Sequence, residues 1–425
     1  MARVLTPQDG YIIMNDLVKQ ATGQENIKVT DLSSFVSAGE KVLATGMENV
    51  FNSLNIVLNR TMIAARPYSA KLKLMEELNT GLYSSRVRKI SFYSKFALPS
   101  GDFNTNLFTN LSDGFTAGQN PDPENTPRST KSQWEQNAPI PLEMNFAGST
   151  TWQHCVTMYE DQVQAAFRSP EEFTSFVSGY LIEHQNDIES TREAWNRMNL
   201  LNKIASVYDM SSNMPGSVVN LTKEYNDKFG TKYTSAQLRT TYLKEFLAFF
   251  VARFKEDSKR LTERTASYHW SPSKTVGDIE YKILRHVPYN RQRVYLYSPL
   301  FVEAESLVLP EIFNPEFLDI ETQYEDVTFW QSNNSDAVRP QINVTPAVVD
   351  TTTGLQKAGT PVNIPFVVGM ITDKDGLMTN IQLEKARTTG VEARKGYRNT
   401  WLTFAKNNMC DNTESCIIYT MEDQK

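Results

Sequence analysis

The feature that most constrains the fold of this chain is a long helical pattern over residues 169–208. Ser169 is a favoured N-cap residue, and Pro170 suits the first helical position, where its missing N–H costs nothing. At ~1.5 Å per residue the pattern predicts a helix of about 58 Å, longer than a small domain is wide. Because strict heptads are absent and the flanking segments have strand character, we expect this helix to lie against a sheet. Its apolar residues recur with a period near 3.6: Phe173, Phe176, Val177, Tyr180, Leu181, Ile188, Trp195, Met198, Leu201 and Ile204.

With 425 residues the chain exceeds what one core usually holds, so two or three compact units are expected.

The N-terminal segment, residues 1–67, is also predicted to contain helices. A short amphipathic helix is predicted after Pro7, and apolar residues at helical spacing between Val42 and Leu58 predict a second one. This N-terminal arm has apolar faces but little core of its own.

Two strands are predicted next, separated by a very long loop. In "KISFYSKFAL" Ile90 and Phe92 alternate with polar residues, and "IPLEMNF" at residues 140–146 alternates in the same way. About 40 residues, 99–139, lie between them, far more than an ordinary hairpin loop contains. One interpretation is that the apolar residues of this loop cap the chain's own sheet. We favour a contact with a neighbouring subunit, and the interface candidates are Phe103, Leu107, Phe108, Leu111, Phe115 and Trp134.

The rest of the chain alternates helices and strands. A second helical unit is predicted over residues 235–261, and the cations near its end are explained by the helix dipole rather than by a nucleic-acid contact. "RQRVYLYS" predicts a buried strand, and a short helix should follow Pro299. Residues 332–363 are expected to form a turn-rich link, and one or two strands should close the chain.

The overall charge means that any contact with nucleic acid or anionic membrane must be local. A formal net charge of −6 gives no overall attraction to nucleic acid or anionic membrane. No run approaches the roughly 18 apolar residues of a membrane span, and the N-terminus has no signal-peptide pattern, so a cytoplasm-like compartment is expected. The three cysteines are widely separated, which favours reduced, structural roles. His154 and Cys155 are neighbours, but adjacent strand residues point to opposite faces, which argues against a catalytic pair.

Three carboxylates suggest a metal loop and then fail its requirements. Asp373, Asp375 and Glu384 occupy the first, third and twelfth positions of a calcium-loop window. The fifth position is Leu377 and the sixth is Met378, so an oxygen ligand and the turn glycine are missing. A β-strand ending in a turn at Gly376 is the better interpretation. A metal-dependent hydrolase built on these carboxylates stays open as an alternative, but no catalytic motif supports an enzyme and no cofactor is implied.

The order of these parts resembles one family. The phrases "SSFVSAGEKVLATGMENVFNSL", "NRTMIAARPY", "CVTMYEDQVQAAFRSPEEFTSFVSGYL" and "PFVVGMITDKDGLM" are similar to those of major capsid (head) proteins of small short-tailed bacteriophages, with the Hong Kong ninety-seven type fold. The resemblance implies an α+β fold with an N-terminal arm, an extended β-hairpin loop, a spine helix in a peripheral domain, and an α/β axial domain. It assigns these parts to residues 1–67 (arm), 68–150 (extended-loop region), 151–209 (peripheral domain with spine helix), 210–360 (axial domain) and 361–425 (return to the peripheral domain).

The resemblance also implies a function. It is that of a non-enzymatic structural protein that self-assembles into hexamers and pentamers of an icosahedral head, enclosing double-stranded DNA without sequence-specific contact. Scaffolding and portal proteins would be partners, no membrane would be involved, and the virion capsid would assemble in the host bacterial cytoplasm. An encapsulin-like compartment shell, which holds enzymes instead of a genome, is the alternative within the same fold. Some members of the family crosslink a loop lysine to a neighbour's asparagine; Lys131 with Asn399, Asn407 or Asn408 would be the candidates.

Overall fold

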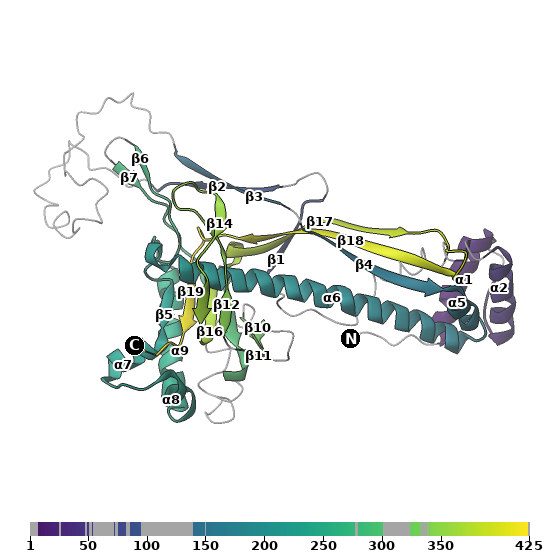
Figure 1. Ribbon diagram of the computed structural model, residues 1–425, viewed down its shortest axis with the longest axis horizontal. Helices are drawn as coiled ribbons and strands as arrows, with labels where there is room; N and C mark the ends of the chain where they lie inside the picture. Colours follow the sequence, from purple (N-terminus) through teal and green to yellow (C-terminus); the bar gives the residue numbers. More distant parts are fainter. Residues whose placement is uncertain are drawn as a thin grey trace, which may run out of the picture.

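A long helix organises the computed structural model of this protein (Figure 1). Helix α6, Pro170–Asp209, has 40 residues and begins as predicted, because the Ser169 hydroxyl accepts a hydrogen bond from the N–H of Glu172 at 3.1 Å. One end of α6 lies among small N-terminal helices, and the other end crosses the body of the molecule (Figure 1). The structure describes residues 7–24, 27–46, 49–50, 53, 72, 75–81, 86–94, 139–148, 150–276, 279–300, 324–332, 338–339 and 341–423.

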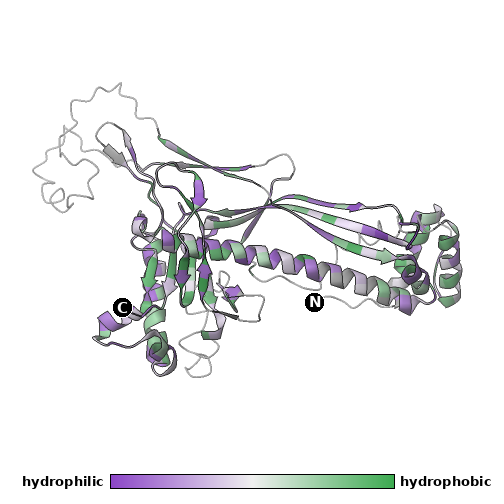
Figure 2. Ribbon diagram, in the orientation of Figure 1, coloured by the Kyte–Doolittle hydropathy of each residue, from purple (hydrophilic) through white to green (hydrophobic). Residues whose placement is uncertain are grey.

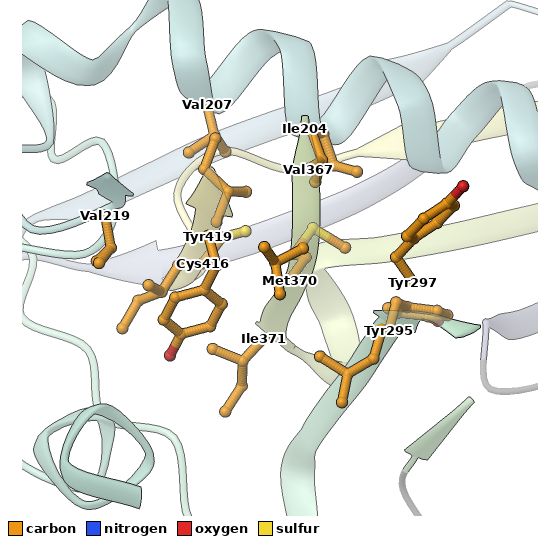
Figure 3. Packing of buried hydrophobic residues seen from close by; sticks show 14 of the residues in the cluster. Ile204, Val207, Val219, Tyr295, Tyr297, Val367, Met370, Ile371, Cys416 and Tyr419 are labelled. Atoms are coloured by element: carbon orange, nitrogen blue, oxygen red, sulfur yellow. The ribbon is translucent and has the colours of Figure 1, made fainter. Parts of the chain in front are cut away.

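A five-stranded sheet forms the core of the body. Its central strand β16 is buried along its whole length and pairs antiparallel with both neighbours. In strand order the sheet contains β5 (Val218–Asn220), β19 (Cys416–Thr420), β16 (Val367–Asp373), β8 (Gln292–Tyr297) and β9 (Tyr324–Val327). Ile204 and Val207 of α6 pack against this sheet beside Val367 and Tyr419 (Figure 3).

Short helices complete the body. Helix α9, Leu243–Leu261, presents the predicted aromatic stripe, in which Phe246, Phe250 and Phe254 are buried. The predicted helical unit is divided, since α8 (Ser235–Thr240) ends before α9 begins. The body also contains helix α7, Leu221–Phe229, and the 3-10 turns Ser211–Asn213, Tyr289–Arg291 and Lys374–Gly376.

A second sheet runs along α6 toward the N-terminal helices (Figure 1). Its strand order is β1 (Glu76–Asn79), β17 (Leu377–Thr388), β18 (Tyr397–Cys410) and β4 (Thr150–Tyr159). We call it the long sheet. β1 pairs with β17 in parallel, whereas the other pairs are antiparallel.

The N-terminal helices build a separate core at the far end of α6. Phe35, Phe167 and Phe173 meet there, with ring centroids 5.4–5.7 Å apart, and all three are buried. The helices are α1 (Pro7–Thr22), α2 (Leu32–Ala44) and α5 (Glu160–Ala166). Their apolar residues form one region and those of the body form another (Figure 2).

Paired strands of two to seven residues make up the remaining described elements. The largest pair, which we call the hairpin, consists of β2 (Arg86–Phe92) and β3 (Pro141–Ala147), in antiparallel register from Arg86 with Ala147 to Phe92 with Pro141. The shorter pairs are β6 (Lys274–Val276) with β7 (Ile279–Tyr281), β10 (Gln331–Ser332) with β11 (Val338–Arg339), β12 (Ile342–Val344) with β15 (Val362–Ile364), and β13 (Ala347–Val349) with β14 (Gln356–Ala358).

The α+β class, the spine-like helix and the strands at residues 86–92 and 141–147 are confirmed. The strand predicted before the turn at Gly376 is present as β16, and it belongs to the five-stranded sheet with β5, β8 and β9. The turn at Lys374–Gly376 therefore carries the chain from one sheet to the other rather than closing a hairpin. The link at residues 332–363 is also more ordered than expected, because β12 to β14 lie within it.

None of the helices in the described ranges is long and apolar enough to cross a membrane.

Candidate functional site

The hairpin presents two faces of different character. Val87, Lys89 and Ser91 of β2 lie on the less exposed face, with Ser91 buried. Ile90 and Phe92 lie on the opposite face and are 49% and 57% exposed. We call these two residues the outer apolar pair. Large apolar side chains are usually the ones a strand turns inward, so a strand that exposes them beside a buried serine points to a surface that another molecule covers.

Ion pairs tie the hairpin to the body. Lys89 contacts both Asp411 and Glu414, which lie in the turn between β18 and β19. Lys203 of α6 donates a hydrogen bond to the Asp411 carbonyl at 2.6 Å, and Arg285 lies 3.2 Å from Glu414. We call these five residues the charged junction.

Titration in the charged junction follows from burial and pairing. Burial alone would lower the pKa of Lys89, but Asp411 and Glu414 outweigh it and raise that pKa. Burial would raise the pKa of Asp411, but Lys89 lowers it. Both groups are therefore held in their charged forms. The arrangement joins the hairpin to the body.

A groove separates the hairpin from α6. It has a volume of about 1030 Å³ and is lined by Met144 of β3, Met198 and Asn202 of α6, Val348 of β13 and Leu355. Met198 and Leu355 are exposed along its rim. The sequence offered no signal for this groove, because its walls come from five separate parts of the chain.

The residues predicted for the subunit interface lie outside the described residues: Phe103, Leu107, Phe108, Leu111, Phe115 and Trp134. Lys131 does too. The predicted acceptor Asn399 accepts a hydrogen bond from the Thr157 hydroxyl at 2.7 Å, and Asn407 donates one to the carbonyl of Phe146 at 3.3 Å. Asn408 lines the groove.

The three carboxylates of the possible metal loop are engaged with arginines. Arg291 lies 2.8 Å from Asp373 and 2.6 Å from Asp375, whereas Glu384 contacts Arg192 of α6 at 3.3 Å. Asp373 also accepts the N–H of Asp375, which shapes the turn. Within the described residues no group of three His, Cys, Asp or Glu side chains could hold a metal ion.

His154 and Cys155 are successive residues of strand β4, so their side chains point to opposite faces of the sheet. The His154 ring stacks on His184 at a centroid distance of 5.0 Å, and its Nε2 lies 3.3 Å from Asp187. Cys155 follows it on β4 and is a free thiol. No hydrogen bond between the two side chains is present among the described contacts.

The long sheet exposes aromatic residues that the sequence analysis did not single out as a surface. Trp401 of β18 pairs in register with Cys155, and Tyr397 pairs with Tyr159 of β4. Trp401 and Tyr159 are exposed, as is Trp152 nearer the body. Together with the outer apolar pair they give the described surface several uncovered apolar positions. These exposed apolar positions are the candidate functional site.

No protein-family model and no curated protein sequence matches this chain. Solved structures similar to it include the capsid structure of Staphylococcus phage Andhra, with 11% identity, a TM-score of 0.49, and coverage of 84% of this chain and 85% of that chain. A structure of the head fiber and inner core protein gp22 of native bacteriophage P68 has 9% identity, a TM-score of 0.48, and coverage of 84% and 86%. The capsid structure of the Cyanophage P-SCSP1u has 12% identity, a TM-score of 0.44, and coverage of 84% and 89%.

Proposed function

We propose that this chain is a structural shell protein, the major capsid protein of a tailed bacteriophage, which self-assembles into the hexamers and pentamers of an icosahedral head. The observation that carries the proposal is the hairpin, whose outer apolar pair is half exposed although it lies on a strand anchored by a buried ion-pair cluster. A two-stranded hairpin is marginally stable by itself. A neighbouring subunit that covers Ile90 and Phe92 would stabilise it by removing apolar surface from water.

The frame of the molecule supports the same proposal. Helix α6 connects two cores that lie at its opposite ends, and the long sheet extends with it (Figure 1). Such an elongated frame has a large surface for the size of its cores. Trp401 and Tyr159 of the long sheet are exposed on that surface. Aromatic side chains of this kind are enriched at the centres of protein interfaces.

The loop at residues 99–139 extends this proposal. Its apolar residues would contact the next subunit, and the extended loop, the N-terminal arm and the hairpin would together hold neighbours in a closed shell. Scaffolding and portal proteins would act in assembly, and double-stranded DNA would be enclosed without sequence-specific contact. The role is structural rather than catalytic, and it places the protein in the virion, after assembly in the cytoplasm of a host bacterium. The five ranges described above for arm, loop, peripheral and axial domains remain part of the proposal.

Electron microscopy of the purified protein tests the proposal. We expect closed shells, alone or with a scaffolding protein, and DNA inside particles isolated from infected cells. Small monodisperse monomers under all such conditions would contradict it. Particles that carry a bound enzyme instead of DNA would indicate an encapsulin-like compartment.

A further inference from the structure

A small pocket lies between α6 and the long sheet, in the stretch that separates the two cores. Its volume is about 90 Å³, and Trp152, Arg192, Trp195, Phe404 and Lys406 are among its walls. A water molecule requires about 10–15 Å³ of such space, so the pocket has room for several waters or for one carboxylate group.

Lys406 of β18 is the unusual member of this pocket. Its side chain is directed toward α6, where Nζ lies 4.9 Å from the centre of the Trp195 ring, and the residue is only 4% exposed. Among the described residues no hydrogen bond or ion pair reaches its ammonium group, although it lines the pocket. A buried charge without a partner is costly, and native proteins rarely keep one unless something else pairs with it.

The neighbours of Lys406 do not supply that partner. Glu77, Glu384 and Glu189 favour the charged form of Lys406, but no ion pair joins it to any of them among the described residues. Arg192 pairs with two of these carboxylates, Glu189 at 3.2 Å and Glu384 at 3.3 Å. Burial, followed by the like charge of Arg192, lowers the pKa of Lys406 to about 8. At neutral pH most Lys406 side chains are therefore still charged, in a position where the described residues offer them an aromatic face and carboxylates that form no ion pair with them.

Trp152 makes this position suitable for a protein partner. Its ring centroid lies 5.4 Å from that of Trp195, yet the residue is 45% exposed. A half-exposed tryptophan beside a buried, unpaired charge has the composition of an interface hot spot, in which an aromatic residue excludes water from a charged contact.

We propose that this pocket receives an aspartate or glutamate side chain from a second copy of the chain, with Lys406 as its ion-pair partner and Trp152 covering the contact. The inference rests on the proposed function. The chain carries 49 acidic and 43 basic residues, so a second copy offers carboxylates in excess. A nucleic-acid phosphate is a poorer match for the pocket. Two cations line it, and one of them, Arg192, already pairs with carboxylates.

Zero-length crosslinking of assembled particles tests this directly. A carbodiimide joins an amine to a carboxylate in contact with it and leaves no spacer. Particles assembled from an equal mixture of ¹⁴N- and ¹⁵N-labelled subunits should yield peptides in which Lys406 of one isotope is joined to an acidic residue of the other. Crosslinks of Lys406 that are confined to one isotope, or the absence of any, in well-formed particles would overturn the inference.

A pair of variants provides an independent measurement. Lys406→Met removes the buried charge, so the unassembled subunit should unfold at a higher urea concentration, while the protein concentration needed for assembly should rise at least tenfold. Lys385→Met removes an exposed lysine from β17 of the same sheet and should change neither. If Lys406→Met subunits are as soluble and stable as expected and assemble at the wild-type concentration, the inference is wrong. Microscopy of wild-type samples separates the two claims, because a wild-type protein that never forms particles refutes the proposed function and this inference with it.

Discussion

Lys89 forms an ion pair with Asp411, which lies 322 residues further along the chain, and this contact fastens the hairpin to the body of the molecule. Glu414 contacts the same ammonium group, and both carboxylates are nearly inaccessible to water. The orientation of the outer apolar pair therefore depends on charges contributed by the opposite end of the sequence.

Replacing this lysine should destabilise the subunit itself. Lys89→Met leaves the buried Asp411 carboxylate without its ion-pair partner and Glu414 with Arg285 alone, and we expect the free energy of unfolding to fall by about 3–5 kcal/mol. Urea denaturation of unassembled protein measures the change. Arg88→Met is the matched control, since Arg88 pairs with Glu143 on the exposed face, where solvent screens the ion pair and it contributes little to stability. Equal effects of the two substitutions would show that the charged junction does not anchor the hairpin.

Substitutions in the outer apolar pair should separate assembly from stability. Ile90→Thr with Phe92→Thr keeps the strand preference of β2 and removes only exposed apolar surface. We expect the urea midpoint of the subunit to change little and the concentration required for assembly to rise at least tenfold. Light scattering during assembly provides the measurement. Normal assembly of a double variant that folds normally would rule out this face as an interface.

Two positions on α6 should differ sharply in how much stability is lost when the side chain is replaced by alanine. Ile204 is fully buried against the five-stranded sheet, so Ile204→Ala should lower the free energy of unfolding by about 2–5 kcal/mol. Met198 is 54% exposed on the same helix, and Met198→Ala should change it by about 0.5 kcal/mol or less. Thermal and urea unfolding would compare the two, and a similar loss in both would mean that the helix is rotated from its described position.

Acid should destabilise the subunit through a buried histidine. Burial lowers the pKa of His269 to about 4, while Nε2 donates to the carbonyl of Ile283 at 2.9 Å. In the unfolded chain the pKa is near 6.5, so between about pH 6.5 and 4 the unfolded state binds more protons and stability falls as pH decreases. The expected contribution approaches roughly 3 kcal/mol at pH 4. His269→Gln can keep the hydrogen bond without titrating, and its urea midpoint should depend less on pH in this window than that of the wild type.

Shortening the long loop should leave the subunit intact. β2 and β3 are already in register as far as Phe92 and Pro141, so their pairing does not require the whole loop. Replacing residues 103–134 with a short Gly-Ser turn should give a folded, soluble monomer that forms no closed shells. Circular dichroism and microscopy report the two properties separately. An unfolded product would place the loop in the subunit core, and normal shells would show that the loop makes no essential contact.

Elements governed by local interactions were predictable from the sequence alone. Helix α6 could be placed within a residue of its ends because the Ser169 cap, Pro170 and an apolar period of 3.6 act within a few residues of one another. The aromatic stripe of α9 and the strands of the hairpin followed from the same kind of pattern. The break between α8 and α9 was missed because the apolar period continues through it.

Sheet membership and burial, in contrast, were decided only by tertiary structure. β16 and β17 are separated by one short turn, yet they join different sheets, because each pairs with strands from distant parts of the chain. The alternation of apolar and polar residues predicted that Ile90 and Phe92 lie on the same face of the strand. It could not say whether that face is buried or exposed, because the pattern repeats every two residues in either case. Likewise, nothing local marks Lys203 as a fully buried lysine whose ammonium group donates to a carbonyl. Nothing local marks Lys406 as a buried lysine that forms no ion pair with the described residues. Burial is set by which segments pack over a residue, and in this chain those segments lie up to hundreds of residues away.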